Sequence, residues 1–331
     1  MKNMNYPIDA VITWVDGEDS RHKAKRMEYG NRSIFKADDV AGSTRFASVG
    51  EIFYCVASLN RFAPWLNKIY IVTDEQNPKV EEFINRHFPE KHIPVEIVDH
   101  KEIFRGYEEY LPTFNSISIE SMTWRIPGLS EHYIEFNDDF LLTAPTKPED
   151  FFTPDGKVVC YGKKYSSLLV RITRLTKYRK NGNKIVSFKE TMCNAARLLG
   201  HYLSFIKLYH TPRALLKSVF EEYFSKHPEN LRKNISHRFR CSNQYNVQEI
   251  QYLILRDSAR CELRRAYDNL LYLKPKKNKP EYTIRKLELF SSKPGFKFAC
   301  INSLDQTTED NQKMIIKWIE RRIGLDTKID K

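Results

Sequence analysis

The feature that most constrains the fold is an alternation of short strand-like runs with helical patterns over the first half of the chain. The strand-like runs are rich in β-branched and aromatic residues and cover 8–15, 69–74, 95–100 and 133–139. Between the first two, Ile52, Val56 and Leu59 fall on one helical face, and Pro64 ends that pattern. Parallel strands need crossover connections, so the sequence predicts an α/β fold with a mainly parallel sheet.

Acidic residues follow these runs, at the points where the strands are expected to end. They are Asp16, Asp74, Asp99, Asp138 and Asp139. The carboxyl ends of parallel strands meet at one edge of the sheet, where ligands of such folds bind, so we expect these acids to gather there. Two adjacent carboxylates after an apolar strand are costly unless something neutralises them. Magnesium bound with nucleotide phosphates takes one or two protein carboxylates, so Asp138 and Asp139 are candidate metal ligands, with a structural cap as the alternative.

Three further positions leave both a structural and a functional interpretation open. Asp16-Gly17 is a common turn pair, although Asp19 nearby adds a second possible oxygen ligand. The pattern around Glu120 favours a solvent-facing helical glutamate. His210 precedes a helix expected to begin at Thr211 and Pro212, where the dipole would favour an anion and keep the imidazole neutral.

The rest of the chain divides by composition. Residues 153–204 are dense in Lys and Arg and read as a basic insertion, and residues 205–331 read as a mainly helical C-terminal part that completes the catalytic core begun in 1–152. The last helix is expected to start at a capping box of Thr307 and Asp310 and to be amphipathic, with Ile315, Trp318, Ile319 and Ile323 on its apolar face.

Composition and charge set the class of protein. With 331 residues, 41% of them hydrophobic, the chain can bury a full core, and its formal charge of +12 predicts a surface that attracts anions. The six cysteines are scattered without a close pair, which indicates a reducing compartment. No leader sequence and no run of 18 apolar residues is present, so we expect a cytoplasmic protein, with peripheral contact at the inner face of the membrane left open.

Four blocks of sequence resemble one known family. They are YPIDAVITWVDGED, the long block from Arg45 through SLNRFAPWLNKIYIVTDEQNP and IPGLSEHYIEFNDDF, LYHTPRALLKSVFEEYF through HRFRCSN, and FACINSLDQ. Their order and content resemble the Stealth family, which includes bacterial capsular polysaccharide phosphotransferases. The resemblance implies a Rossmann-like nucleotide-sugar transferase core.

The resemblance also implies an activity and a set of site residues. The expected reaction transfers a sugar 1-phosphate from a nucleotide-diphosphate sugar, with a UDP-N-acetylhexosamine (UDP-HexNAc) as the expected donor, to a hydroxyl of a growing capsular or exopolysaccharide chain. It would form a phosphodiester and release a nucleoside monophosphate. Mg2+ or Mn2+ is the expected cofactor. The implied catalytic residues are His210, Glu120, Asp16 and Arg240; the metal ligands are Asp138 and Asp139; and the substrate-binding residues are Asp19, Arg45, Asn115, Asn137, Asn302 and Asp305.

One departure and two rival functions follow from the same residues. The last family block often carries an acid after the asparagine, whereas Ser303 follows Asn302 here and Asp305 is retained. A metal-dependent glycosyltransferase would use the same fold and acids but release a nucleoside diphosphate. A non-catalytic polyanion-binding protein would bind without turnover, and a nucleic-acid partner is not expected because the aromatic residues lie in apolar patterns rather than among the basic clusters.

Overall fold

A computed structural model describes residues 6–30, 49–173, 187–266, 269–293 and 295–325. Arg45 and the middle of the basic 153–204 segment therefore lie outside the described residues. Within the described ranges, no helix is long and apolar enough to cross a membrane.

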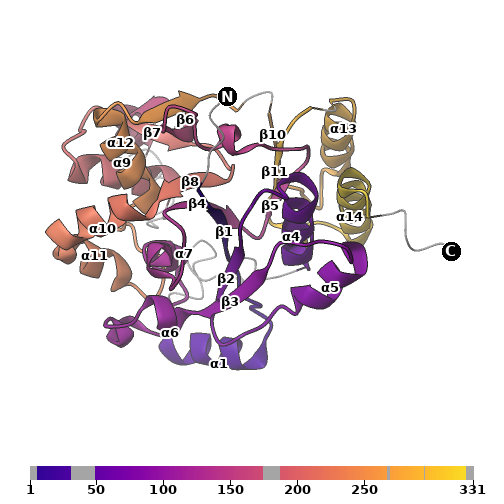
Figure 1. The fold of residues 1–331 in the computed structure, drawn as a ribbon, viewed down its shortest axis with the longest axis horizontal. Coiled ribbons are helices and arrows are strands. Elements are labelled where there is room, and N and C mark those ends of the chain that lie inside the picture. The colour runs from indigo at the N-terminus through magenta and orange to yellow at the C-terminus, as the bar shows by residue number, and fades with distance from the viewer. Residues whose placement is uncertain (1–5, 31–48, 174–186, 267–268, 294, 326–331) are drawn as a thin grey trace.

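A five-stranded sheet forms the centre of the molecule (Figure 1), in the order β3-β2-β1-β4-β8. Its strands are β1 (Ile8–Thr13), β2 (Ile69–Thr73), β3 (Val95–Asp99), β4 (His132–Asn137) and β8 (Arg213–Leu216). The first four are parallel, and β8 runs antiparallel to β4. The predicted α/β fold with a mainly parallel sheet is confirmed, and its four parallel strands coincide with the four runs seen in the sequence.

Burial on both faces explains why the middle of β1, residues 10–12, is continuously apolar. Ala10, Val11 and Ile12 are fully buried, and Ala10 lies beside Ile69 of β2 and Ile134 of β4. The order of the strands reverses here, because the chain moves from β1 to β2 on one side and β4 pairs with β1 on the other. In open α/β sheets ligands bind at such a reversal, which here lies at the carboxyl ends of β1 and β4.

Helices and short 3-10 turns cover the sheet. The first half contributes α1 (Ser20–Tyr29), α4 (Glu51–Phe62), α5 (Val80–His87), α6 (His100–Ile103), α7 (Ser116–Glu120) and the 3-10 turns Glu108–Tyr110, Thr123–Arg125 and Pro148–Asp150. Helix α4 buries Ile52, Val56 and Leu59 as predicted and ends just before Ala63 and Pro64.

A second sheet of three strands begins two residues after β4 ends. It contains β5 (Phe140–Leu142), β10 (Leu270–Leu273) and β11 (Phe298–Ile301), in the order β10-β11-β5. Helices α13 (Pro280–Ser291) and α14 (Glu309–Ile323) lie beside it, on one side of the central sheet (Figure 1). Helix α14 buries Ile315, Ile319 and Ile323 as predicted, but its cap is Thr308, one residue later than expected.

A third sheet lies on the other side of the central sheet, with two helices against it (Figure 1). It consists of β6 (Val158–Ser166), β7 (Ser204–Leu208) and β9 (Cys261–Arg264), packed with α9 (Phe188–Leu198) and α12 (Val247–Asp257). Val158, Val159 and Cys160 of β6 are buried. The described part of the basic segment therefore contributes a strand and a helix to the core, while its limits at 153 and 204 stay predictions.

The helix expected from Thr211 is wrong at its start. Arg213–Leu216 is strand β8, and the helix, α10 (Lys217–Lys226), begins at Lys217, followed by α11 (Pro228–Ile235). The apolar residues of 213–216 pair with β4 in register Ile134↔Ala214 and Tyr133↔Leu215 and are all buried. Long-range pairing at the open edge of β4 outweighs the local cap signal.

Gly162 marks a close approach between β6 and β7, and its replacement tests that packing. A Cβ atom there would meet Ile206 Cγ2 at 2.7 Å and the Lys207 carbonyl oxygen at 3.1 Å. Because the backbone of the pair has to shift, Gly162→Ala should lower the free energy of unfolding by about 1–3 kcal/mol in urea titrations. Gly295→Ala is the matched control, since nothing lies within 4 Å of its added Cβ. Equal stability of the two variants would contradict the close approach.

Candidate functional site

The centre of the candidate site is the turn Asp138–Asp139 between β4 and β5. Strand β11 fixes this turn, because Ile301 N donates to the Asp139 carbonyl oxygen at 3.0 Å. Asp139 Oδ2 accepts hydrogen bonds from Asn302 Nδ2 at 3.2 Å and from Cys300 Sγ at 3.5 Å. Asp139 Oδ1 is buried without a hydrogen-bond partner in the part of the chain that the structure describes. One carboxylate oxygen is thus oriented by the protein while the other is left for a ligand.

The carboxylates of this turn lie close together where little water can reach them, so their negative charges are unfavourable. Burial raises the pKa of Asp138 well above its usual value, with the charges of Asp139 and Glu51 adding to the effect. Burial likewise raises the pKa of Asp139, although Asn302 and Cys300 oppose the shift. These acids line one pocket, together with Glu51, Tyr54, Leu141, Ile301, Leu304 and Ile319. A cation in this pocket would relieve the repulsion.

The donor set fits a hard divalent cation that keeps other ligands. In the described ranges, no group of three His, Cys, Asp or Glu side chains is close enough to hold a metal alone. Two adjacent carboxylates match magnesium, which takes few protein ligands and completes its shell with water and substrate phosphates. Asn302 directs its amide nitrogen at Asp139, while its amide oxygen accepts from Ser303 Oγ at 3.1 Å. Asp305, in the 3-10 turn Leu304–Gln306, accepts a hydrogen bond from Gln306 Nε2 at 2.9 Å, and its charge contributes to the raised pKa of Glu51.

A buried chain of polar side chains runs from this turn to Glu120. Arg213 Nη1 donates to Glu135 Oε1 at 2.9 Å and to Asn137 Oδ1 at 3.5 Å. Gln248 Nε2 donates to Glu120 Oε2 at 3.0 Å and also to Glu135 Oε1. Glu120 is only 8% exposed, so the solvent-facing interpretation of this residue is wrong. We call Glu120, Glu135, Arg213 and Gln248 the buried polar chain.

Charges within the buried polar chain balance one another only in part. Burial and the nearby Glu120 charge raise the pKa of Glu135 to about 7, against the opposing effect of Arg213. Burial by itself lowers the pKa of Arg213, but the charges of Glu120 and Glu135 outweigh it, so that pKa lies above its usual value. Sequence reasoning missed Glu135, Arg213 and Gln248. The available signal was Glu135 itself, a charged residue in an apolar strand that requires a buried partner.

Arg240 approaches Glu120 from the other side. Its Nη2 donates to Ser116 Oγ at 2.6 Å, and burial lowers its pKa while the Glu120 charge raises it. Asn115 is fully buried: it caps α7 by accepting from Ile117 N and donates to the His237 carbonyl oxygen and to Gln244 Oε1. Asn115 therefore holds α7 against the segment that carries Arg240, which is a scaffold role.

His210 lies between two aromatic rings at the end of β7. Its ring stacks on Tyr272, with centroids 4.7 Å apart, and on Phe188 at 5.8 Å. Burial lowers the pKa of His210 to about 4, and the charges of Arg213, Lys207 and Lys274 add to the effect. The imidazole is neutral near pH 7, as the sequence led us to expect. The physical cause differs from the helix dipole that was expected. Strand β8 follows His210 in place of a helix, and burial near positive charges lowers the pKa of the imidazole instead.

Tyr272 and Arg213 connect His210 to the acidic turn. Burial raises the pKa of Tyr272 to about 12, with the charges of Cys300 and Asp139 contributing. The charge of Arg213 acts on both His210 and Asp139. The structure therefore brings Asp139, Arg213, His210, Glu120 and Arg240 into one region at the carboxyl end of β4.

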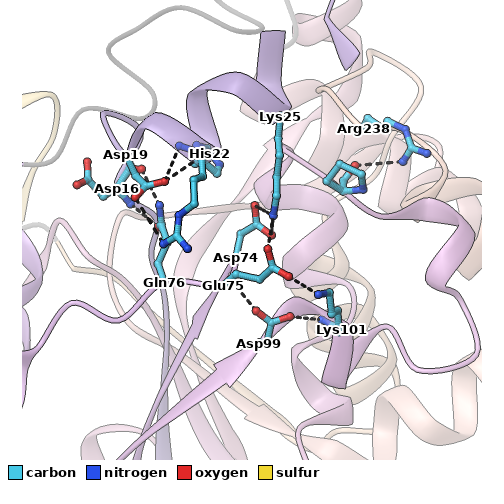
Figure 2. Close-up of polar contacts among 12 residues, drawn as sticks. Asp16, Asp19, His22, Lys25, Asp74, Glu75, Gln76, Asp99, Lys101 and Arg238 are labelled. Atoms are coloured by element: carbon cyan, nitrogen blue, oxygen red, sulfur yellow. Dashed lines mark hydrogen bonds and ion pairs between the residues drawn. The ribbon is translucent and has the colours of Figure 1, made fainter. Parts of the chain in front are cut away.

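The acids after β1, β2 and β3 are occupied locally (Figure 2). Asp16 Oδ1 accepts from Glu18 N at 2.9 Å, a turn contact, while Gln76 bonds the Asp16 backbone at 2.8 and 2.9 Å. Asp19 caps α1 by accepting from Arg21 N and His22 N, and the bond from His22 N is the main reason its pKa is lowered.

Asp74 and Asp99 are likewise paired with neighbouring groups of the protein (Figure 2). Lys25 Nζ lies 3.4 Å from Asp74 Oδ1, and Asp99 accepts from the backbone nitrogens of Glu75 and Lys101. The expected gathering of all strand-end acids into one metal-binding group is not found among the described residues, where no three Asp, Glu, His or Cys side chains are placed to hold a metal.

Comparison with known proteins points to one family. Residues 6–34 match the family model of Stealth protein conserved region 1, and residues 45–160 match that of conserved region 2. The chain is 36% identical to the receptor polysaccharide phosphotransferase WefC of Streptococcus gordonii, over 74% of this chain and 77% of that protein. It is also 36% identical to the capsular polysaccharide phosphotransferase fcs1 of Haemophilus influenzae, over 75% of this chain.

The chain spans only part of several of these relatives. It covers 64% of fcs1 and 38% of the exopolysaccharide phosphotransferase SCO2594 of Streptomyces coelicolor. Among solved structures, the galactosyltransferase LgtC is 10% identical with a TM-score of 0.44 over 98% of each chain, and the bifunctional glycosyltransferase WbbM is 9% identical with a TM-score of 0.47. Both scores lie below 0.5, and the fold described above rests on the strand order of this chain itself.

The environment of His210 predicts a specific dependence of stability on pH. The folded pKa of about 4 lies below the usual value of 6.5, so between these values the unfolded chain binds a proton that the folded chain does not. Stability should therefore rise with pH across this window, and His210 should account for about 2–3 kcal/mol of that rise. In urea titrations from pH 4 to 7, His210→Gln should flatten the curve and His227→Gln, at a half-exposed site, should not. A His210→Gln curve parallel to wild type would contradict the burial described.

Proposed function

The chain belongs to the Stealth family, and from that membership we propose that it transfers a sugar 1-phosphate from a nucleotide-diphosphate sugar to a hydroxyl of a capsular or exopolysaccharide chain. Its relatives carry the names capsular, receptor and exopolysaccharide phosphotransferase. The observation that carries the proposal is the acidic turn, where a buried oxygen of Asp139 has no hydrogen-bond partner among the described residues and His210 and two arginines lie in the same region.

Asp138 and Asp139 would hold the expected Mg2+ or Mn2+, with Asn302 orienting Asp139. When bound, such a cation neutralises charge on the donor diphosphate. The protein itself orients Asp139. Asn302 and Cys300 donate hydrogen bonds to one of its carboxylate oxygens, so that the other is directed away from them. The Arg213–Asn137 contact fixes the residue that precedes the acidic turn.

Phosphoryl transfer asks the protein mainly for positioning and for neutralisation of charge. In the proposed reaction, the acceptor oxygen bonds to the phosphorus nearer the sugar, and the bond from that phosphorus to the bridging oxygen breaks. The nucleoside monophosphate leaves with the bridging oxygen, and the sugar keeps its anomeric configuration. Arg240 supplies positive charge to the phosphoryl oxygens, and its contact with Ser116 sets the position of its guanidinium group.

His210 is the proposed acceptor of the proton from the attacking hydroxyl. Its low pKa keeps it in the neutral form that can take a proton, and Tyr272 and Phe188 hold its ring from two sides. Glu120 positions the acceptor or the base, and Gln248 fixes its carboxylate. The expected donor is UDP-HexNAc, as the family resemblance implies.

Metal binding at the acidic turn predicts that Asp139→Asn keeps the stability of the metal-free protein but abolishes its stabilisation by Mn2+. In the presence of a chelator, Asp139→Asn should be at least as stable as wild type near pH 8, because it removes one of two buried like charges while its amide oxygen still accepts from Asn302. Mn2+ at about 100 times its Kd should stabilise wild type by about 2.7 kcal/mol and leave the variant unchanged. Thermal unfolding with and without Mn2+ measures this, with Asp310→Asn at an exposed site as control. Equal responses of Asp139→Asn and wild type would remove Asp139 from the metal site.

The products distinguish the proposed reaction from that of a glycosyltransferase. Phosphorus NMR of the protein with UDP-HexNAc, other nucleotide sugars, Mg2+ and short glycan primers should show a new phosphodiester together with nucleoside monophosphate. His210→Ala should lower the rate by at least about 100-fold, and His227→Ala should not. Release of nucleoside diphosphate without a phosphodiester would replace the proposal by the glycosyltransferase alternative. Binding of nucleotide sugars without any turnover would leave only the binding-protein alternative.

A further inference from the structure

An exposed group of large apolar side chains lies at the end of the β6–β7 hairpin. Leu203 is 87% exposed, Tyr202 70% and Leu168 60%. Three further exposed apolar side chains lie next to them in the sequence: Leu169, Ile172 and Leu198. We call these six residues the hairpin-end patch. Elsewhere in the described chain the exposed large apolar residues occur in ones and twos, on α1, β9, α13 and the start of α9, where Phe188 lies.

Backbone contacts bring the members of the hairpin-end patch together. Ser166 pairs with Ser204 across the hairpin, and Ser167 N donates to the Leu203 carbonyl oxygen at 3.0 Å. Residues 167–173 are helical, with Val170 buried and Leu168, Leu169 and Ile172 facing away from the core. The chain turns after α9, where His201 N donates to the Ala196 carbonyl oxygen at 2.8 Å, and leads directly into Tyr202 and Leu203. The Ser167–Leu203 bond therefore places the start of the helical residues 167–173 beside Leu203.

The stretch of chain that carries the hairpin-end patch is mostly positive, although one exposed acid at the end of α12, Asp257, pairs with His201 beside the patch at 2.7 Å. Between Lys163 and Lys207 the sequence contains a single acidic residue, Glu190. The described basic residues of this stretch are Lys163, Lys164, Arg171, Lys189, Arg197 and Lys207, all at least partly exposed. A partner for this surface therefore has to offer both an apolar interior and negative charge.

From this combination we infer that the hairpin-end patch docks on the surface of an anionic lipid bilayer. Leucine and tyrosine side chains enter the boundary between head groups and acyl chains, and each flanking Lys or Arg is attracted to anionic head groups. A second copy of the chain is a poorer partner, because a two-fold interface would bring two such positive rims together. The inference concerns only the surface and does not depend on the proposed reaction.

Docking in this way would set the candidate site close to the membrane. Helix α9 carries Leu198 of the patch at one end and Phe188, which stacks on His210, at the other. Its 11 residues span roughly 16 Å. Strand β7 makes the same connection, since it starts next to Leu203 and ends at Leu208, two residues before His210. In Figure 1, β6, β7 and α9 form one end of the molecule, away from α13 and α14.

Vesicle binding tests the inference without any need for turnover. The full chain is sedimented with vesicles of phosphatidylcholine alone and with vesicles of phosphatidylcholine and phosphatidylglycerol in equal parts. Wild type should bind the anionic vesicles only. The double variant Leu168→Asp/Leu203→Asp should bind them at least about tenfold more weakly, because it loses two apolar contacts and adds two negative charges. The control Ile284→Asp/Leu289→Asp, at exposed sites on α13, should bind like wild type.

Other outcomes would overturn the inference. Wild type that stays in solution with anionic vesicles, or equal binding by wild type and Leu168→Asp/Leu203→Asp, would remove the patch as a lipid surface. Light scattering on the same samples identifies the alternative occupant: a wild-type dimer that becomes monomeric in the double variant, with vesicle binding unchanged, would assign the patch to contact between copies. Circular dichroism of each variant checks that it is folded, which is expected because the substituted side chains are exposed.

Discussion

The arrangement of the candidate site depends on how the chain crosses from the central sheet to the second sheet. Strand β4 ends at Asn137 and β5 begins at Phe140, so the crossing takes two residues, and both are aspartates. Strand β11 pairs with β5, and Ile301 N of β11 donates to the carbonyl oxygen of Asp139. These contacts fix the backbone of the acidic turn. Two carboxylates held in a partly buried turn repel each other, and the neighbouring groups compensate for that repulsion. Asn302 and Cys300 donate to one of them, and Arg213 places its charge nearby.

The buried polar chain extends this constraint to the opposite side of the site. Glu120 and Glu135 share the amide of Gln248, and Arg213 neutralises Glu135 while contacting Asn137. The position of Glu120 is thereby coupled to the strand that carries the acidic turn. Buried ion pairs of this kind add little net stability, because the charges lose their hydration. Their benefit is geometric: the two acids, the histidine and the arginines are held in place before any substrate arrives.

The sequence predicts the elements whose signals are local. Strands β1–β4 and helix α4 follow from period and composition, because all of them except β3, where Val98 alone is buried, bury a complete face, and each ends at a residue that stops the pattern. Strand β8 could not be predicted in this way, since its partner in β4 lies about 80 residues away and its own start resembles a helix cap. The same limit applies to the site. Gln248 and Asn302 are more than 100 residues from Glu120 and Asp139, and only the fold brings them into contact. The family resemblance implies that Asp19 and Asn115 bind substrate, whereas in the structure both side chains serve as helix caps.

The location of the metal is the central claim, and diffraction tests it most directly. Crystals grown with Mn2+ and a nucleoside diphosphate would be measured at a wavelength where manganese scatters anomalously. We predict one anomalous peak at the acidic turn, about 2.1 Å from a carboxylate oxygen of Asp138 or Asp139. A peak at Asp16 or Asp74 instead, or none near the end of β4, would contradict the account.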